Sequence, residues 1–123
     1  MKRIKIIHGK PLTGKTRLAK MISKEFENPF WVDGRNLPPI EYLELTKTTD
    51  LIVIDDLPVE KLMDVSFNFF SEKIIVNRQC QPIFEIKTPK VIITLTDECC
   101  LKKLPASILK RSEFIKTVKF KIR

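Results

Sequence analysis

The segment GKPLTGKT at residues 9–16 places two glycines, a lysine and a threonine at spacings that suit phosphate binding. Glycine lets the backbone pass close to an anion with its amides turned inward. Lys15 can reach the β- and γ-phosphates, and the hydroxyl of Thr16 can ligate Mg²⁺. The segment matches the pattern G-x-x-x-x-G-K-S/T, which predicts a phosphate-binding loop rather than an ordinary turn. The residues expected to contact a nucleotide are Gly9, Lys10, Pro11, Leu12, Thr13, Gly14, Lys15, Thr16 and Arg17.

Two adjacent acids, Asp55 and Asp56, close the apolar segment LIVIDD. Such a run is typical of a central parallel strand. A carboxylate at the end of a strand beside the loop can hold Mg²⁺, directly or through water, and Asp55 is placed for this role. Asp56 can then orient or deprotonate an attacking water. A lone acid here could simply end a strand, but together with the lysine loop the pair predicts a metal-and-water site.

Polar residues also mark the ends of two other expected strands. The segment KVIITLTD leads to Thr94 and Thr96, and Thr96 is the candidate to sense hydrolysis or position water beside the γ-phosphate. The alternative is a threonine that is present only because threonine is common in strands. Asp33 ends the segment PFWVD, where a small-molecule kinase can meet its phosphoryl acceptor and other proteins simply end a strand. Trp31 in the same segment is expected in the core.

The elements that would position these residues alternate between apolar strands and amphipathic helices, which predicts an α/β fold with a parallel sheet. Strands are expected at residues 4–8, 29–33, 51–56 and 90–97, with an edge strand at 118–123. A helix is expected at residues 16–27, with an apolar face made of Leu18, Ala19, Ile22 and Phe26. A second helix follows Pro58, and its expected core stripe is Val59, Leu62, Met63, Phe67 and Phe70. The short segments IIVN and IFEI flank a polar turn and predict a β-hairpin.

The order of these features resembles the AAA+ ATPases, and most closely the superfamily 3 helicases of small DNA viruses and related replication initiators. The resemblance covers nearly the whole chain. It implies a three-layer P-loop NTPase with a central parallel sheet of about five strands and a β-hairpin insertion. It also implies Mg²⁺-dependent ATP hydrolysis coupled to the handling of DNA, with ATP and Mg²⁺ as the bound groups.

The resemblance also suggests roles for single residues. Thr96 stands where the family's sensor strand usually has asparagine. Arg111 is the best match to an arginine finger, which acts on the nucleotide of a neighbouring subunit, and its alternative is a solvated helix charge. Family hairpins usually present a lysine where this chain has Gln79, so Arg78 is the substitute for DNA contact. The helical oligomerisation domain that precedes the ATPase in these helicases is not recognised here, so either a homo-oligomeric ring or a larger replication protein is the expected partner.

Composition agrees with a single domain over residues 1–123, whose positive charge could either bind polyanions or simply keep the protein in solution. The chain has 43% hydrophobic residues and a formal net charge of +8, which attracts nucleic acid, nucleotides or acidic membranes. Lys73, Arg78 and Lys87 cluster around the expected hairpin and are the candidate nucleic-acid contacts. We expect no membrane segment and no signal peptide. Three cysteines, two of them adjacent, indicate reduced thiols and a cytoplasmic location.

Three functions are therefore compatible with the sequence. The first is an enzyme, a nucleic-acid-associated ATPase with a helicase-like core. The second is a small nucleoside or nucleotide kinase, which shares the loop and the sheet, although no arginine-rich lid is apparent. The third is a nucleotide-sensing interaction module with little turnover that docks on a larger protein.

Overall fold

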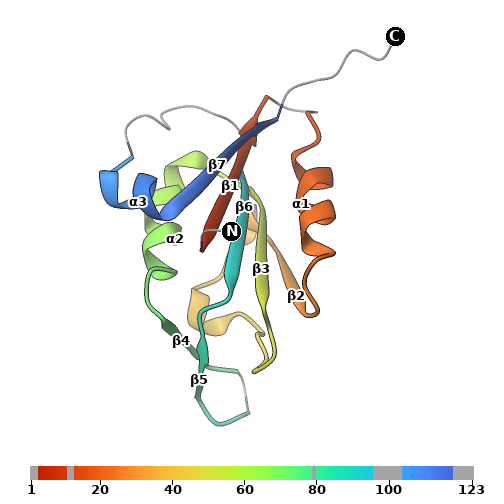
Figure 1. Cartoon of the computed structure of the whole chain (residues 1–123). Coiled ribbons are helices and arrows are strands. Elements are labelled where there is room, and N and C mark those ends of the chain that lie inside the picture. Colours follow the sequence, from red (N-terminus) through yellow and green to blue (C-terminus); the bar gives the residue numbers. More distant parts are fainter. Residues whose placement is uncertain (1–2, 11–12, 79, 96–103, 118–123) are drawn as a thin grey trace.

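The computed structural model describes residues 3–10, 13–78, 80–95 and 104–117 (Figure 1). Pro11, Leu12, Gln79 and Thr96 lie outside this part of the chain, and so does the edge strand expected at residues 118–123. None of the helices within it is long and apolar enough to cross a membrane.

The centre of the molecule is a five-stranded parallel sheet with the strand order β2-β3-β6-β1-β7. Its strands are β1 (Ile4–Gly9), β2 (Pro29–Asp33), β3 (Leu51–Leu57), β6 (Lys90–Leu95) and β7 (Ser112–Thr117). Because all five run in the same direction, their carboxyl ends meet at one edge, where α/β proteins bind ligands. The predicted α/β fold with a parallel sheet of about five strands is confirmed.

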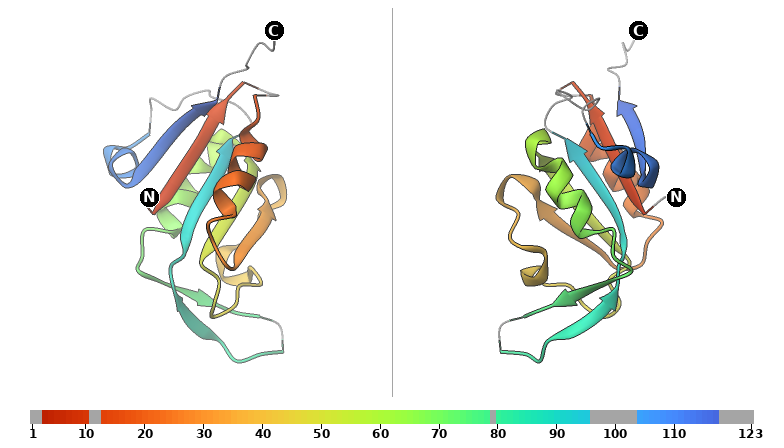
Figure 2. Two further views of the ribbon diagram at one scale, coloured as in Figure 1. Left: turned by 45° about the vertical axis from the view of Figure 1, so that its right-hand side comes forward. Right: turned by 90° about the vertical axis from the view of Figure 1, so that its left-hand side faces the viewer.

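Helices cover both faces of this sheet. Helix α1 (Lys15–Ser23) lies on one face, and α2 (Leu62–Asn68) and α3 (Ala106–Arg111) lie on the other (Figures 1 and 2). Three short 3₁₀ helices complete the connections: η1 (Gly34–Asn36), η2 (Ile40–Tyr42) and η3 (Val59–Lys61). The layers explain why β3 and β6 are almost continuously apolar, since a central parallel strand is buried on both of its faces.

The two faces of the sheet bury cores of different size. On the α1 side the buried residues are Ile7, Ala19, Leu51, Val53 and Ile92, and Leu18, Ile22 and Phe26 pack against them as predicted. Helix α1 itself ends at Ser23, four residues before the predicted end. The larger core on the other side includes residues of α2, of the segment after η2 and of the hairpin.

The stripe predicted for the second helix is wrong at two positions. Met63 and Phe67 are 42% and 45% exposed, whereas Phe69 is completely buried. The reason is that η3, a 3₁₀ helix with fewer residues per turn, precedes α2. The side chains of α2 are therefore rotated about the helix axis relative to those of one continuous α-helix starting at Val59. Within α2 and the residue that caps it, the buried positions are Leu62, Val65, Ser66 and Phe69, which is the spacing of one helical face.

The predicted hairpin is confirmed as a separate antiparallel pair, β4 (Lys73–Val76) and β5 (Phe84–Lys87). It extends from the end of the sheet opposite the tip of β1 (Figure 1). A backbone bond from Asn77 N to Glu41 O ties it to η2, and another from Thr88 N to Glu72 O closes its base. The hairpin is thus held firmly although it lies outside the main sheet.

The buried position of Phe69 predicts a contrast between two phenylalanines of one segment. Phe69→Ala should lower the free energy of unfolding by about 3–5 kcal/mol, because it leaves a cavity in the larger core. Phe67→Ala should lower it by about 1 kcal/mol or less. Urea unfolding monitored by circular dichroism measures both values. Equal losses would contradict the assignment of α2's buried face.

Candidate active site

The predicted phosphate-binding loop joins the end of β1 to the start of α1, as the sequence pattern requires. Its two glycines are needed for different reasons. A Cβ on Gly9 would lie 2.5 Å from Thr117 Oγ1 and 2.7 Å from Thr117 O, so a side chain would collide with β7. Gly14 has φ of 85°, a conformation that glycine adopts without strain, and it caps α1.

Lys15 is the first residue of α1 and only 8% exposed. Its Nζ donates a hydrogen bond of 2.9 Å to Gly9 O, so the ammonium group turns back into the loop. A buried cation at a helix N-terminus favours an anion at the same place. To hold a phosphate, Lys15 would exchange the Gly9 carbonyl for phosphate oxygens.

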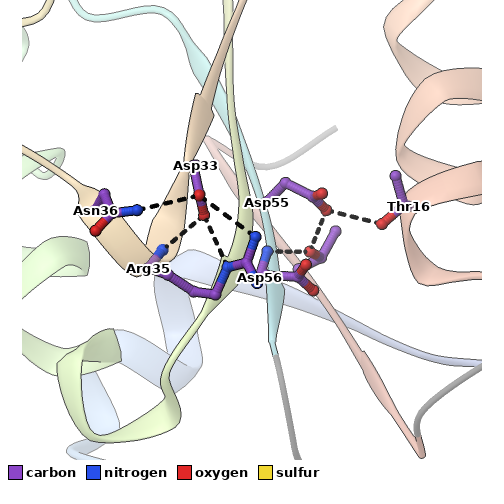
Figure 3. Close-up of polar contacts among 7 residues, drawn as sticks. Thr16, Asp33, Arg35, Asn36, Asp55 and Asp56 are labelled. Atoms are coloured by element: carbon purple, nitrogen blue, oxygen red, sulfur yellow. Dashed lines mark hydrogen bonds and ion pairs between the residues drawn. The ribbon is translucent and has the colours of Figure 1, made fainter.

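Asp55 connects the loop to the neighbouring strands. Its Oδ1 accepts a hydrogen bond of 2.9 Å from Thr16 Oγ1 and one of 2.7 Å from Thr94 Oγ1. Thr94 Oγ1 in turn accepts a bond of 2.8 Å from the backbone N–H of Asp56. Figure 3 shows this chain of contacts running from Thr16 to Asp56. Residues from α1, β3 and β6 are therefore brought together as predicted for Thr16 and Asp55.

The backbone of β3 is irregular where the two acids lie. Its pairing with β6 shifts register between Ile54 and Leu57, and Asp56 has φ of 59°. Adjacent strand residues normally point to opposite faces, but a bulge re-aims a side chain. Aspartate tolerates this left-handed conformation better than most residues. The irregularity explains how the side chains of two consecutive acids can both lie at the carboxyl edge of the sheet.

Thr94 takes part in this cluster, although Thr96 is the threonine predicted from the sequence for a role here. Thr96 lies outside the described residues. Thr94 is completely buried, and its hydroxyl bridges the side chain of Asp55 and the backbone of Asp56. Its role could have been predicted from its position inside an apolar strand, because a buried hydroxyl needs a hydrogen-bonding partner.

A second polar group lies at the end of β2. Asp33 Oδ1 accepts bonds from the backbone N of Arg35 (2.9 Å) and from its Nε (3.2 Å), and Asn36 donates to Oδ2. The backbone N–H of Arg35, followed by its guanidinium, lowers the pKa of the Asp33 carboxyl. Arg35 was not identified from the sequence, since no motif marks it.

Asp33 and Arg35 line a pocket of about 320 Å³ with Asp55 and Asp56. Trp31 lines it too and is 36% exposed, so its predicted place in the core is wrong. The reason is that β2 is an edge strand whose alternate side chains face outward.

A larger pocket of about 440 Å³ lies on the other side of the loop, between α1 and the end of β7. Its lining residues are Thr13, Gly14, Arg17, Leu18, Met21, Lys116 and Thr117. The hydroxyls of Thr13 and Thr117 bond to each other and tie the loop to β7. Leu18 and Met21 supply an apolar wall next to the predicted contact residue Arg17.

Arg111 lies far from the phosphate-binding loop of its own chain. It is the last residue of α3, and its guanidinium lies over the ring of Phe70 at 4.8 Å. Ser112 pairs with Ile4 at the start of β1, whereas Thr117 pairs with Gly9 at the end. Arg111 is therefore about 20 Å from the loop, the length of the six-residue strand β7.

The predicted nucleic-acid contacts gather on the hairpin. Lys73 and Lys87 are exposed and directly opposite each other in the β4–β5 pair. Arg78 follows β4 and lines a polar pocket of about 490 Å³ with Tyr42 and Glu44. Two like charges facing each other repel, which an anionic ligand would relieve.

The cluster around Asp55 suits a magnesium ion. Its donors are the hydroxyls of Thr16 and Thr94 and a carboxylate, and Mg²⁺ prefers such oxygen ligands. The described residues include no group of three or more His, Cys, Asp or Glu side chains that could hold a metal by themselves. A magnesium ion here would therefore complete its shell with water and substrate phosphates, as is usual for this metal.

Comparisons with known proteins agree with this geometry at the level of the fold. No protein-family model matches the sequence, and no curated protein matches it. Similar solved structures include the C-terminal region of NrS-1 in an apo form and the helicase of JC virus with a thiazolopyridine compound bound, each with a TM-score of 0.63 and 18% identity. The chain has a helicase-like P-loop fold.

This P-loop fold accounts for only part of either neighbour. The alignments cover 93% and 94% of this chain but 28% of the NrS-1 chain and 36% of the JC virus chain. The chain thus spans about a third of the length of the proteins it resembles. At 18% identity the likeness establishes the P-loop architecture and leaves the chemistry to be argued from the residues themselves.

The bridging role of Thr94 predicts a loss of stability when its hydroxyl is removed. Thr94→Val should lower the free energy of unfolding by about 1–3 kcal/mol, because the buried N–H of Asp56 loses its acceptor. Thr48→Val, at an exposed loop position, is the control and should change it by about 0.5 kcal/mol or less. Denaturant unfolding of the two variants tests the difference, and equal values would argue against the bridge.

Proposed function

We propose that this chain is a Mg²⁺-dependent ATPase that handles nucleic acid as a helicase-like core. The observation that carries the proposal is the contact of Thr16 and Thr94 with one oxygen of Asp55, directly beside the buried Lys15. The helicase-like P-loop fold supports it, because these residues occupy the loop and the carboxyl edge of the sheet.

Nucleotide binding would use the phosphate-binding loop, the pocket between α1 and β7, and the cluster of Thr16 and Asp55. The backbone amides after Gly9 and the N-terminus of α1 favour the phosphates, and Lys15 supplies the compensating charge. The pocket of Leu18, Met21 and Thr117 would receive the base and sugar. Mg²⁺, held by Thr16 and Asp55, would neutralise charge on the β- and γ-phosphates.

The hydrolytic step assigns Asp56 as the base. The oxygen of a water forms a bond to the γ-phosphorus while the bond from phosphorus to the bridging oxygen of the diphosphate breaks. Asp56 accepts the proton of the water, and the products are ADP and inorganic phosphate. Lys15 stabilises the charge that develops on the phosphoryl oxygens. Thr94 holds the backbone of Asp56 so that its carboxylate stays near the γ-phosphate. Thr96, two residues further along, keeps its proposed role as sensor.

Nucleic acid would bind at the other end of the molecule. Lys73, Lys87 and Arg78 place positive charge on a hairpin that protrudes from the sheet (Figure 1). Charges of this kind contact the phosphate backbone without reading sequence. We propose DNA as the polynucleotide on the basis of the resemblance to superfamily 3 helicases.

Arg111 requires a second subunit for the role suggested by that resemblance. Its place at the end of the sheet opposite the loop means that it could reach only the nucleotide of a neighbouring copy. We therefore propose a homo-oligomer, or a larger replication-protein assembly, in which Arg111 acts in trans.

The structure offers a specific argument against the kinase alternative. Asp33, the candidate to meet a phosphoryl acceptor, is already engaged by the backbone and side chain of Arg35. An acid held in this way is a poor base for a substrate hydroxyl, because its charged form is favoured.

Hydrolysis should depend on Lys15. Lys15→Ala should reduce ATP turnover by about 100-fold or more, because the lysine contacts the transferred phosphoryl group. Lys20→Ala, exposed on the same helix, is the matched control and should keep wild-type turnover. Phosphate release is measured with Mg²⁺, with and without single-stranded DNA. ATP binding without turnover in either condition would instead support the nucleotide-sensing module.

The hairpin lysines should set the salt dependence of DNA binding. Lys73→Gln with Lys87→Gln should make the slope of log K against log salt less negative by up to about 1.4, since each lost phosphate contact removes about 0.7 from its magnitude on single strands. The control pair is Lys20→Gln with Lys24→Gln, two exposed lysines on α1 and at its C-terminal cap, which changes the net charge equally. Fluorescence anisotropy of labelled single-stranded DNA gives both slopes. An equal decrease in the control would show that only net charge matters.

A further inference from the structure

Arg35 is a cation held in a defined place at the edge of the candidate active site. Its Nε and one terminal nitrogen lie 3.2 and 3.5 Å from the two oxygens of Asp33, and its own backbone N–H bonds to the same carboxylate. The side chain of Arg35 is 65% exposed, so it is fixed by this ion pair rather than by burial.

The position of Arg35 follows from the register of the sheet. Asp33 at the end of β2 pairs with Asp55 at the end of β3, so η1 begins beside the two acids. Gly34 permits this approach, because a Cβ there would lie 2.7 Å from the backbone of Leu57 and 2.8 Å from Asp55 O. The close packing of η1 on β3 brings Arg35 into the pocket lined by Asp55 and Asp56.

The two acids are not equivalent toward this arginine. Asp55 Oδ1 already accepts two hydroxyl groups on the loop side. Within the described part of the chain, the carboxylate of Asp56 accepts no hydrogen bond. Arg35 approaches it from the β2 side, opposite the loop (Figure 3). After Asp33, the charge of Asp56 is the largest electrostatic contribution that raises the pKa of Arg35, ahead of Asp55.

We propose that Arg35, anchored by Asp33, is a positioning residue that orients the carboxylate of Asp56. The guanidinium attracts the carboxylate from the side away from the phosphate-binding loop, which limits the directions it can take. It also offsets part of the charge of two adjacent acids. The catalytic consequence rests on the proposed hydrolytic function, whereas the attraction itself can be measured without turnover.

The kinetic test separates positioning from nucleotide binding. Arg35→Gln should lower kcat for ATP hydrolysis by about 10-fold or more and leave KM within about threefold, because misorientation of the base affects the chemical step. Arg35→Lys should recover part of the loss by restoring the charge. Asp33→Asn should also lower kcat, since the guanidinium loses its anchor. Lys61→Gln, an exposed charge on η3, is the control and should leave both constants unchanged.

A second measurement uses the chain without nucleotide. Mn²⁺ as a probe for Mg²⁺ should bind Arg35→Gln about threefold more tightly or better than wild type, because a repelling charge beside the acids is gone. Electron paramagnetic resonance gives the affinity, and quenching of Trp31 in the same pocket reports the site. Lys61→Gln should bind like wild type.

The outcomes distinguish the inference from the proposed function. Unchanged kcat in Arg35→Gln, or a rise in KM alone, would overturn the positioning role. Unchanged Mn²⁺ affinity would overturn it as well, because the guanidinium would then not act on the acids. If wild type shows no turnover, the proposed ATPase function fails, and Mn²⁺ binding still decides whether Arg35 acts on Asp56.

Discussion

One oxygen of Asp55 connects the parts of this molecule that matter for chemistry. It accepts hydroxyl groups from Thr16 and Thr94, each 39 residues away in sequence. These contacts join the start of α1 to the ends of β3 and β6. Because both hydroxyl groups donate to the same oxygen, they lose their freedom to rotate. In the function proposed here, a metal ion bound to this oxygen would replace hydrogen bonds that already align the site.

Backbone geometry makes this arrangement possible. The chain has three glycines, and all three lie in or beside the candidate site. Gly9 avoids a collision with β7, Gly14 takes up the conformation that starts α1, and Gly34 lets η1 pack against β3. The irregular backbone at Asp56 is a fourth local feature of the site. Gly9 and Gly34 allow a closer approach of two segments than side chains would permit, whereas Gly14 and Asp56 adopt left-handed backbone conformations.

The parallel sheet divides the molecule into two ends with different chemistry. The loop and the acids lie at the carboxyl ends of the strands, and the basic hairpin and Arg111 lie at the other end. Strand β7 connects the two ends directly, because it follows Arg111 and reaches the loop through Thr117. In the function proposed here, a neighbouring subunit contacting Arg111 would therefore act on a strand that borders the nucleotide pocket.

The sequence by itself determined the alternation of strands and helices, the hairpin, the loop and the acid pair. These depend on local patterns: apolar runs for buried strands, glycine and lysine spacing for the loop, and acids at a strand end. It misplaced the buried face of α2, because a 3₁₀ turn changes the helical phase in a way that periodicity does not reveal. Only the tertiary structure decided that Thr94 bridges the acids, that Trp31 is partly exposed and that Arg35 lines one pocket with Asp56. Each of these depends on strand order and register, which bring together residues whose separation in sequence carries no signal of their contact.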